Sequence, residues 1–149
     1  MSRCAATRIW SSRRSSRSTS SRVESAMCPC GSGAAFDTCC GPVLAGTPAV
    51  TAEALMRSRF SAFARGDAAY LLRSWHPSTR PADLDLDADV EWRRLQIVDT
   101  VDGGADDAEG VVEFRASFRG PDGAGLMRER SRFARVDGRW VYVDGEQLD

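Results

Sequence analysis

The chain has 149 residues, 42% of them hydrophobic, which is enough to bury the core of one domain plus a small additional element. The formal net charge is −1, but residues 1–26 contribute +5 (six Arg, one Glu) and residues 27–149 contribute −6 (fourteen Arg, twenty Asp or Glu). An acidic globular part argues against nucleic-acid binding. No apolar stretch approaches the length of a membrane span, and clustered free thiols favour a reducing compartment, so we expect a cytoplasmic protein.

Residues 1–26 are mostly serine and arginine and show no hydrophobic periodicity. This composition cannot bury enough apolar surface to fold, so it predicts a disordered tail. Three origins remain open: translated sequence upstream of a true start at Met27, an organelle transit peptide, or a functional basic arm. Cys4 lies in this tail, and we expect it to have no role.

Four cysteines follow within thirteen residues, in the spacing C-x-C-x8-C-C: Cys28, Cys30, Cys39 and Cys40. Four thiolates satisfy the tetrahedral coordination of a closed structural Zn²⁺ site, and Gly31-Ser32-Gly33 lets the chain turn after the first pair. Gly41-Pro42 is expected to stop any short helix that carries the second pair. The alternatives are ordinary buried cysteines, an iron–sulfur cluster or a redox dithiol.

The segment from Cys28 to Gly41, CPCGSGAAFDTCCG, resembles the SEC-C motif, a small zinc-binding element that also ends the SecA preprotein-translocation motor. The resemblance implies that the four cysteines are the zinc ligands and that residues 27–42 form this motif. Members that bind acidic partners carry Lys-Lys-x-Lys-Lys after CPCGSG. Here those positions hold other residues, Ala34, Ala35, Asp37 and Thr38, so the resemblance transfers the metal site without the basic face.

Two amphipathic helices are predicted next. Thr51 is a suitable N-cap, apolar residues recur at helical spacing up to Arg65, and Gly66 ends the first helix. Asp67 caps a second helix, which should reach Trp75 because His76 precedes a proline. The acidic stretch 81–91 is expected to be a solvated loop or a short helix that leads into the sheet.

From Glu91 the hydrophobic period changes to two, and four strands are predicted around Leu95–Val101, Val112–Phe118, Met127–Val136 and Arg139–Asp144. Asp137-Gly138 is a strong two-residue hairpin signal. The predicted fold is therefore α+β: the N-terminal zinc element, then two helices packed on a curved four-stranded antiparallel sheet.

Residues 27–149 also resemble the YchJ family. Four stretches carry the resemblance: LMRSRF from Leu55, WHPSTR from Trp75, ERSRF from Glu129 and WVYVDG from Trp140. The family joins a SEC-C motif to a domain similar to the cone-shaped nuclear transport factor 2, which we place at residues 50–146. The resemblance implies a fold and a metal, but no reaction.

The sequence assigns no catalytic residue. His76 is the single histidine, no nucleophile elbow is present, and a closed metal site leaves no position for an activated water. A cone could still enclose a cavity. Strand periodicity points Glu129 inward, where Arg57 or Arg59 could pair with it. The candidate pocket residues are Arg57, Tyr70, Trp75, His76, Glu129, Ser131 and Tyr142.

The leading hypothesis is a non-catalytic zinc-binding accessory protein that acts through an unidentified protein partner near protein export or ribosomes. The alternative is a small-molecule-binding protein or enzyme that uses the cone pocket. We expect the zinc element to depend on its metal and the domain from about residue 50 to fold by itself.

Overall fold

The computed structural model describes residues 27–148. The segment 1–26, with the predicted tail and Cys4, lies outside the described residues. A 3₁₀ turn, η2 (Phe36–Thr38), and a short helix, α2 (Cys40–Leu44), precede two further helices, α3 (Ala52–Arg65) and α4 (Ala68–Arg73). The remaining elements form one antiparallel sheet in the order in which they follow in the chain: β1 (Glu91–Asp102), β2 (Glu109–Gly120), β3 (Gly123–Val136) and β4 (Arg139–Leu148). The predicted α+β architecture is confirmed.

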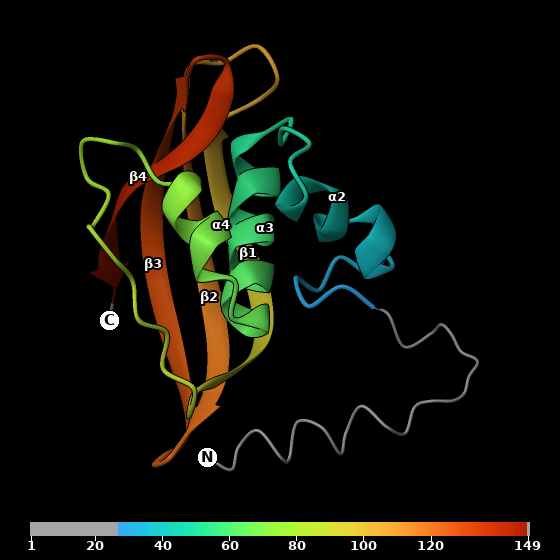
Figure 1. The fold of residues 1–149 in the computed structure, drawn as a ribbon, viewed down its shortest axis with the longest axis vertical. Helices are drawn as coiled ribbons and strands as arrows, with labels where there is room; N and C mark the ends of the chain where they lie inside the picture. The colour runs from blue at the N-terminus through green and yellow to red at the C-terminus, as the bar shows by residue number, and fades with distance from the viewer. Residues whose placement is uncertain (1–26, 149) are drawn as a thin grey trace.

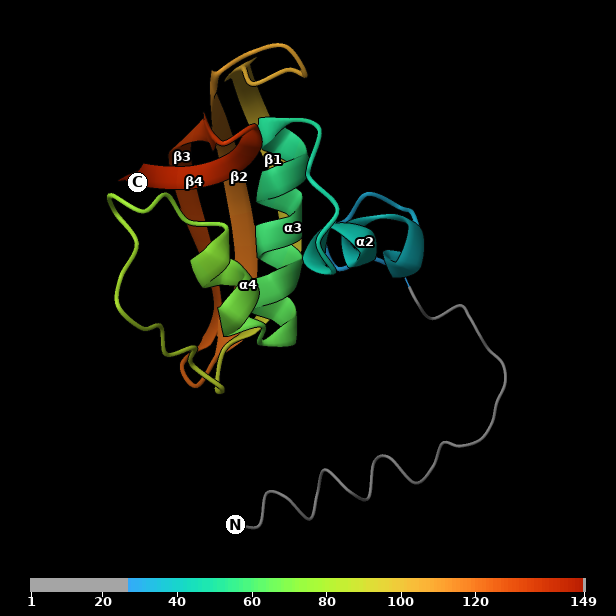
Figure 2. The ribbon, with the colours of Figure 1, turned by 45° about the horizontal axis from the view of Figure 1, so that its top comes forward.

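Helices α3 and α4 cover the same face of the twisted sheet (Figure 1). The element that carries α2 lies on the other side of α3 from α4, and a second view shows the same arrangement (Figure 2). Helix α3 is therefore the central element, because it contacts α2, α4 and the sheet. None of the helices between residues 27 and 148 is long and apolar enough to cross a bilayer.

The ends of the helices follow the predicted capping residues. The Thr51 hydroxyl accepts a hydrogen bond from the backbone N–H of Ala54 at 3.0 Å, and the Asp67 carboxylate accepts one from Tyr70 at 3.0 Å. Gly66 ends α3 in the left-handed conformation, with φ of 76°. These caps satisfy backbone groups that a helix end would otherwise leave unpaired.

Helix α4 is shorter than predicted, because the backbone that follows it pairs with the sheet. The N–H of Tyr142 donates to the carbonyl of Ser74 at 2.9 Å, and the N–H of His76 donates to the carbonyl of Tyr142 at 2.7 Å. Trp75 and Tyr142 thereby form a parallel bridge. This bridge joins the α4 end to β4 and closes one side of the cone.

The prediction that Gly41-Pro42 stops a helix is wrong, since both residues lie inside α2. Proline is tolerated in the first turn of a helix, where its missing N–H would have no partner. Gly41 is required by a close approach: a Cβ atom at this position would lie 2.8 Å from the carbonyl oxygen of Phe36.

The inner face of the sheet alternates as expected from the sequence. Buried side chains from β2 and β3 point toward the helices, among them Val112, Phe114, Ala116, Ser131 and Phe133. The Asp137–Gly138 hairpin turn has positive φ at both residues, 54° and 82°, as a type I′ turn requires. Residues 81–90 contain no helix or strand and are mostly exposed, as predicted.

The core does not stop at the boundary between the cysteine-bearing element and the domain. Cys28, Cys30 and Cys40 belong to the same buried cluster as Leu55, Met56 and Phe60 of α3 and as residues of β1–β4. The cysteine-bearing element is therefore packed into the domain rather than tethered to it.

Candidate metal centre and interior cavity

The four predicted metal ligands converge. The Sγ atoms of Cys28, Cys30, Cys39 and Cys40 all lie within 4.8 Å of one another. Two of the separations, 3.6 Å between Cys30 and Cys39 and 4.0 Å between Cys39 and Cys40, are close to the roughly 3.8 Å edge of a tetrahedron with zinc–sulfur bonds of about 2.3 Å. The set fits a closed, four-coordinate site for a thiophilic metal ion.

A tight turn brings the first cysteine pair together. The N–H of Cys28 donates to the carbonyl of Ala34 at 2.9 Å, and Gly31 takes a φ of 83° that an L side chain rarely adopts. The Ser32 hydroxyl lies 3.1 Å from the Sγ atom of Cys39. The glycines predicted to allow this turn therefore have that role.

Helix α3 supplies a second layer of contacts to the thiols. Arg57 donates through Nη1 to the carbonyl of Cys30 at 3.0 Å and lies 3.9 Å from the Cys30 sulfur. The Ser61 hydroxyl lies 3.5 Å from the Sγ atom of Cys28. Such groups orient the ligands of a metal and balance their charge.

The thiols are electrostatically unequal. Hydrogen bonds from the side chain of Cys40 and from Ser32 lower the pKa of Cys30 to about 4, although burial opposes the shift. The hydrogen bond to Cys30, followed by burial, raises the pKa of Cys40. The Arg57 guanidinium lies beside Cys30, the thiol whose pKa is lowered.

The opposite side of α3 faces a cavity that opens to solvent. Its apolar part, of about 160 Å³, lies between α3 and the sheet and is lined by Met56, Phe60, Phe63, Trp92, Phe114, Ala116 and Met127. A smaller part, of about 90 Å³, shares Met56, Phe63, Phe114 and Met127 and adds Arg59, Trp75, Glu129, Ser131 and Tyr142. Because four wall residues are common to both parts, they adjoin, and the cavity has an apolar end and a polar end.

Glu129 is buried at the polar end, as strand periodicity predicted. Its Oε2 atom accepts hydrogen bonds from the Ser131 hydroxyl at 2.7 Å and from the Tyr142 hydroxyl at 2.9 Å. Burial, followed by the charge of Glu129, raises the pKa of Tyr142, so the phenol keeps the proton that it donates. Gly145 on β4 makes this position possible, because a Cβ atom there would overlap the Glu129 carboxylate.

The expected ion pair between Glu129 and an α3 arginine does not form among the described residues. Arg59 is 3% exposed and donates through Nη1 to the Leu71 carbonyl at 2.9 Å and to the Ser74 hydroxyl at 2.7 Å. Its guanidinium carbon lies 4.5 Å from the ring centroid of Tyr142 and 4.9 Å from that of Trp75. Burial lowers the pKa of Arg59 to about 10, which shows that its neighbours only partly offset the loss of hydration.

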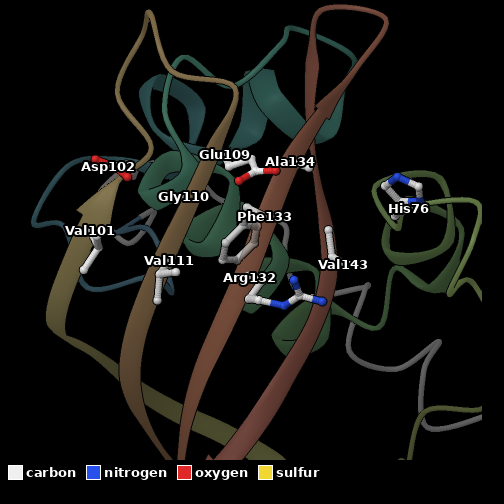
Figure 3. Close-up of a pocket in the computed structure, with 10 residues that line it drawn as sticks. All are labelled: His76, Val101, Asp102, Glu109, Gly110, Val111, Arg132, Phe133, Ala134 and Val143. Atoms are coloured by element: carbon white, nitrogen blue, oxygen red, sulfur yellow. The ribbon is translucent and has the colours of Figure 1, made fainter.

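Three predicted pocket residues lie elsewhere. Arg57 is at the thiol cluster, because its position on α3 points it away from the sheet. Tyr70 is buried against Ser58, with 2.6 Å between the two hydroxyl oxygens. His76 lies at the rim of a different, open depression of about 290 Å³, whose other walls include Glu109, Val111 and Arg132 (Figure 3). Its Nδ1 atom accepts from the Ser78 N–H at 3.0 Å, a local turn contact.

The other four candidate pocket residues, Trp75, Glu129, Ser131 and Tyr142, line the polar end of the cavity together. From the sequence alone, Arg57 and Arg59 are equal candidates to pair with Glu129. Helical spacing could have distinguished them: Arg59 follows Met56 by three residues and precedes Phe63 by four, which puts all three on one helical face. Ser61 and Ser74 were missed, because a serine in or after a helix carries no periodic signal.

These observations define a two-part class of protein, in which an element with four clustered cysteines that could hold a metal ion is packed onto an α+β cone with a cavity. Residues 51–145 match the family described as YchJ, middle NTF2-like domain, and residues 25–42 match the SEC-C motif. The chain belongs to the YchJ family, also named UPF0225.

Relatives and solved structures agree with this assignment. The chain is 59% identical to UPF0225 protein SCO1677 of Streptomyces coelicolor, and the match covers 82% of this chain and 96% of the relative. It is 52% identical to a UPF0225 protein of Streptomyces avermitilis, and that match covers 89% of this chain and 95% of the relative. The solution structure of a SEC-C motif containing protein from Rhodopseudomonas palustris superposes with a TM-score of 0.71 at 36% identity, covering 82% of this chain and 98% of that one. A crystal structure of a SEC-C motif containing protein from Psychrobacter arcticus gives 0.65 at 27% identity, covering 78% and 80%.

Proposed function

We propose that the chain holds one Zn²⁺ ion at Cys28, Cys30, Cys39 and Cys40 and that the ion is structural. The observation that supports this most directly is the convergence of four Sγ atoms within 4.8 Å, three of them on buried residues. Four thiolates saturate a tetrahedral zinc ion and leave no position for substrate or water. The ion has no redox chemistry of its own, so its contribution is to hold the element and α3 together.

Metal analysis tests the identity of the ion. Protein purified under reducing conditions should contain about one equivalent of zinc and no stoichiometric iron. Replacement by Co²⁺ should give the intense ligand-to-metal absorption of a tetrahedral Cys4 site. A protein with about two or more equivalents of iron and acid-labile sulfide would instead establish the iron–sulfur alternative.

We further propose that the protein is a cytoplasmic accessory protein whose zinc element presents a surface to a protein partner near protein export or ribosomes. The likeness to the SEC-C motif of the export motor supports the setting, and that support is an analogy. Exposed residues of the element support the surface: Met27 is 61% exposed, and Ser32, Gly33, Asp37 and Thr38 are also exposed. A photocrosslinking residue at Asp37 should capture the same partner in each preparation, and it should lose that partner when zinc is removed.

The second candidate function is small-molecule binding in the interior cavity. It is favoured by one observation: the polar end places a buried arginine and a buried glutamate in the same cavity wall without a direct ion pair. No fully buried nitrogen or oxygen atom of Arg59 or Glu129 is without a hydrogen bond, so their remaining donor and acceptor atoms face solvent in the cavity and are open to a ligand. A ligand that still binds when the zinc ligands are replaced would favour this function over the first.

A further inference from the structure

We propose that the interior cavity binds a small, neutral molecule in which an aromatic ring carries a carboxamide-type group, with a hydrogen-bond donor beside an acceptor. The proposal rests on the second candidate function and adds the chemical class of the ligand. Three features support it: the size of the apolar end, the presence of both Arg59 and Glu129 at the polar end without a direct ion pair, and the hydrogen-bonding capacity that each of them leaves unused.

The apolar end has the size and lining of a site for one aromatic ring. Its volume is about 160 Å³, and all its wall residues are apolar. An engineered apolar cavity of about 150 Å³ in another protein stays dry and binds benzene. Aromatic side chains already meet there edge to face, with 6.1 Å between the ring centroids of Phe60 and Trp92 at an interplanar angle of 74°. A ligand ring would extend this packing.

The polar end has room for one further group of a few atoms, since its volume is about 90 Å³. Arg59 uses both Nη1 hydrogens within the protein, on Leu71 and Ser74. Its Nε and Nη2 groups meet no acceptor among residues 27–148, although its ring contacts with Trp75 and Tyr142 hold the guanidinium in place. Arg59 therefore offers directed donors to the cavity.

Glu129 offers the complementary acceptor. Its Oε2 atom receives the Ser131 and Tyr142 hydroxyls, while Oε1 receives no hydrogen bond from the described part of the chain. The cavity therefore presents donor capacity and acceptor capacity from two fixed, buried side chains that do not meet each other. A ligand group that accepts a hydrogen bond from Arg59 and donates one to Glu129 would use the remaining hydrogen-bonding capacity of both side chains.

A carboxamide carries both functions on adjacent atoms, and it is neutral. A carboxylate would satisfy Arg59 but would place a second negative charge beside Glu129. A hydrocarbon would fill the apolar end and leave both polar side chains without partners. Sites built around buried hydrogen-bonding groups discriminate strongly against analogues that lack the matching group.

Binding of three probes of equal ring size to the full, zinc-loaded chain tests the proposal: benzamide, benzoate and toluene, measured by ligand-observed NMR and calorimetry. Benzamide should bind at least tenfold more tightly than either of the others. Toluene that binds as tightly as benzamide would overturn the donor–acceptor assignment while preserving cavity binding. Failure of all three to bind would overturn the cavity function as well.

Two variants sharpen the test. Ala116→Leu fills the apolar end, so it should keep or raise the melting temperature and weaken benzamide at least tenfold, whereas Ala124→Leu on the exposed part of β3 should leave binding unchanged. Glu129→Gln removes the negative charge, so the affinity ratio of benzoate to benzamide should rise at least tenfold. An unchanged ratio, or unchanged binding in Ala116→Leu, would contradict the assignment.

Discussion

The two sides of α3 carry chemistry of opposite kinds. One stripe, Glu53, Arg57, Ser61 and Arg65, faces the cysteine element: Arg57 and Ser61 reach the thiols and Arg65 stacks on Phe36 at 4.2 Å. The other stripe, Met56, Arg59, Phe60 and Phe63, faces the interior cavity. On the first side, four closely spaced thiols are arranged to saturate one ion. On the second side, buried charges are held apart beside unfilled space.

The two sides of α3 therefore differ in role: the cysteine side can stabilise the fold, and the cavity side can bind a ligand. A closed Cys4 centre contributes folding free energy and offers nothing to a substrate. A cavity with buried, incompletely paired polar groups costs stability, and a ligand would recover that cost. Substitutions on each side of α3 test whether the two sides have these different roles.

Removal of two metal ligands should have the largest effect. The double replacement Cys39→Ser and Cys40→Ser should reduce bound zinc from about one equivalent to nearly none, because two thiolates cannot hold the ion tetrahedrally. Elemental analysis measures the loss, and thermal unfolding should show a strongly destabilised protein. Cys4→Ser, outside the cluster, is the matched control and should keep the metal. Full zinc in the double variant would disprove the site.

Arg57→Met should be the next largest change. The variant removes the hydrogen bond to the Cys30 carbonyl and the positive charge beside the Cys30 sulfur, which leaves a half-buried acceptor unpaired. We expect a loss of about 2–3 kcal/mol in unfolding free energy and roughly tenfold weaker zinc affinity in a chelator competition. Arg93→Met, whose exposed ion pair with Glu91 spans 3.6 Å, should cost less than about 0.5 kcal/mol. Equal losses of unfolding free energy and of zinc affinity in the two variants would show that Arg57 does not support the metal centre.

Gly145→Ala probes the cavity side. The added methyl group would overlap the Glu129 carboxylate and push it off the Tyr142 and Ser131 hydroxyls. Chemical denaturation should show a loss of about 2 kcal/mol, typical of overpacking at a buried site. Gly120→Ala is the control, because a Cβ atom there meets only Val90, at an ordinary distance of 3.8 Å. If both alanine variants were equally stable, Glu129 would not occupy the position described.

Glu129→Gln should have the smallest effect. Glutamine has the same shape and can still accept from Tyr142, so only the charge near Arg59 is lost, at a cost of about 1–2 kcal/mol. Breaking a direct buried ion pair would instead cost about 3–5 kcal/mol. Denaturation of the two proteins side by side distinguishes the values, and the larger one would restore the ion pair expected from the sequence.

Much of this structure could be predicted from local signals in the sequence. Thr51, Gly66 and Asp67 specify helix ends through single side chains or a single backbone conformation, and Asp137-Gly138 specifies a turn. The four cysteines could be grouped because metal geometry demands their proximity. In each case the cause lies within a few residues of its effect.

What the sequence could not supply depends on contacts between distant segments. Helix α4 ends early because Ser74 and His76 pair with Tyr142, more than sixty residues later. Arg57 and Arg59 have the same side chain, and only the packing of α3 between the cysteine element and the sheet sends one to the thiols and the other to the cavity. The volume of that cavity likewise follows from side chains of α3 and of all four strands.

Thermal unfolding with and without a zinc chelator, followed by tryptophan fluorescence, tests the central claim most directly, because Trp75, Trp92 and Trp140 all lie in the domain beyond residue 50. Because Cys28, Cys30 and Cys40 share one core with α3 and the sheet, metal removal should lower a single cooperative transition by on the order of 10 °C or more. The sequence alone favoured an independent domain from about residue 50. A fluorescence transition that stays within about 2 °C after complete zinc removal would support that independence and contradict a metal centre built into the core.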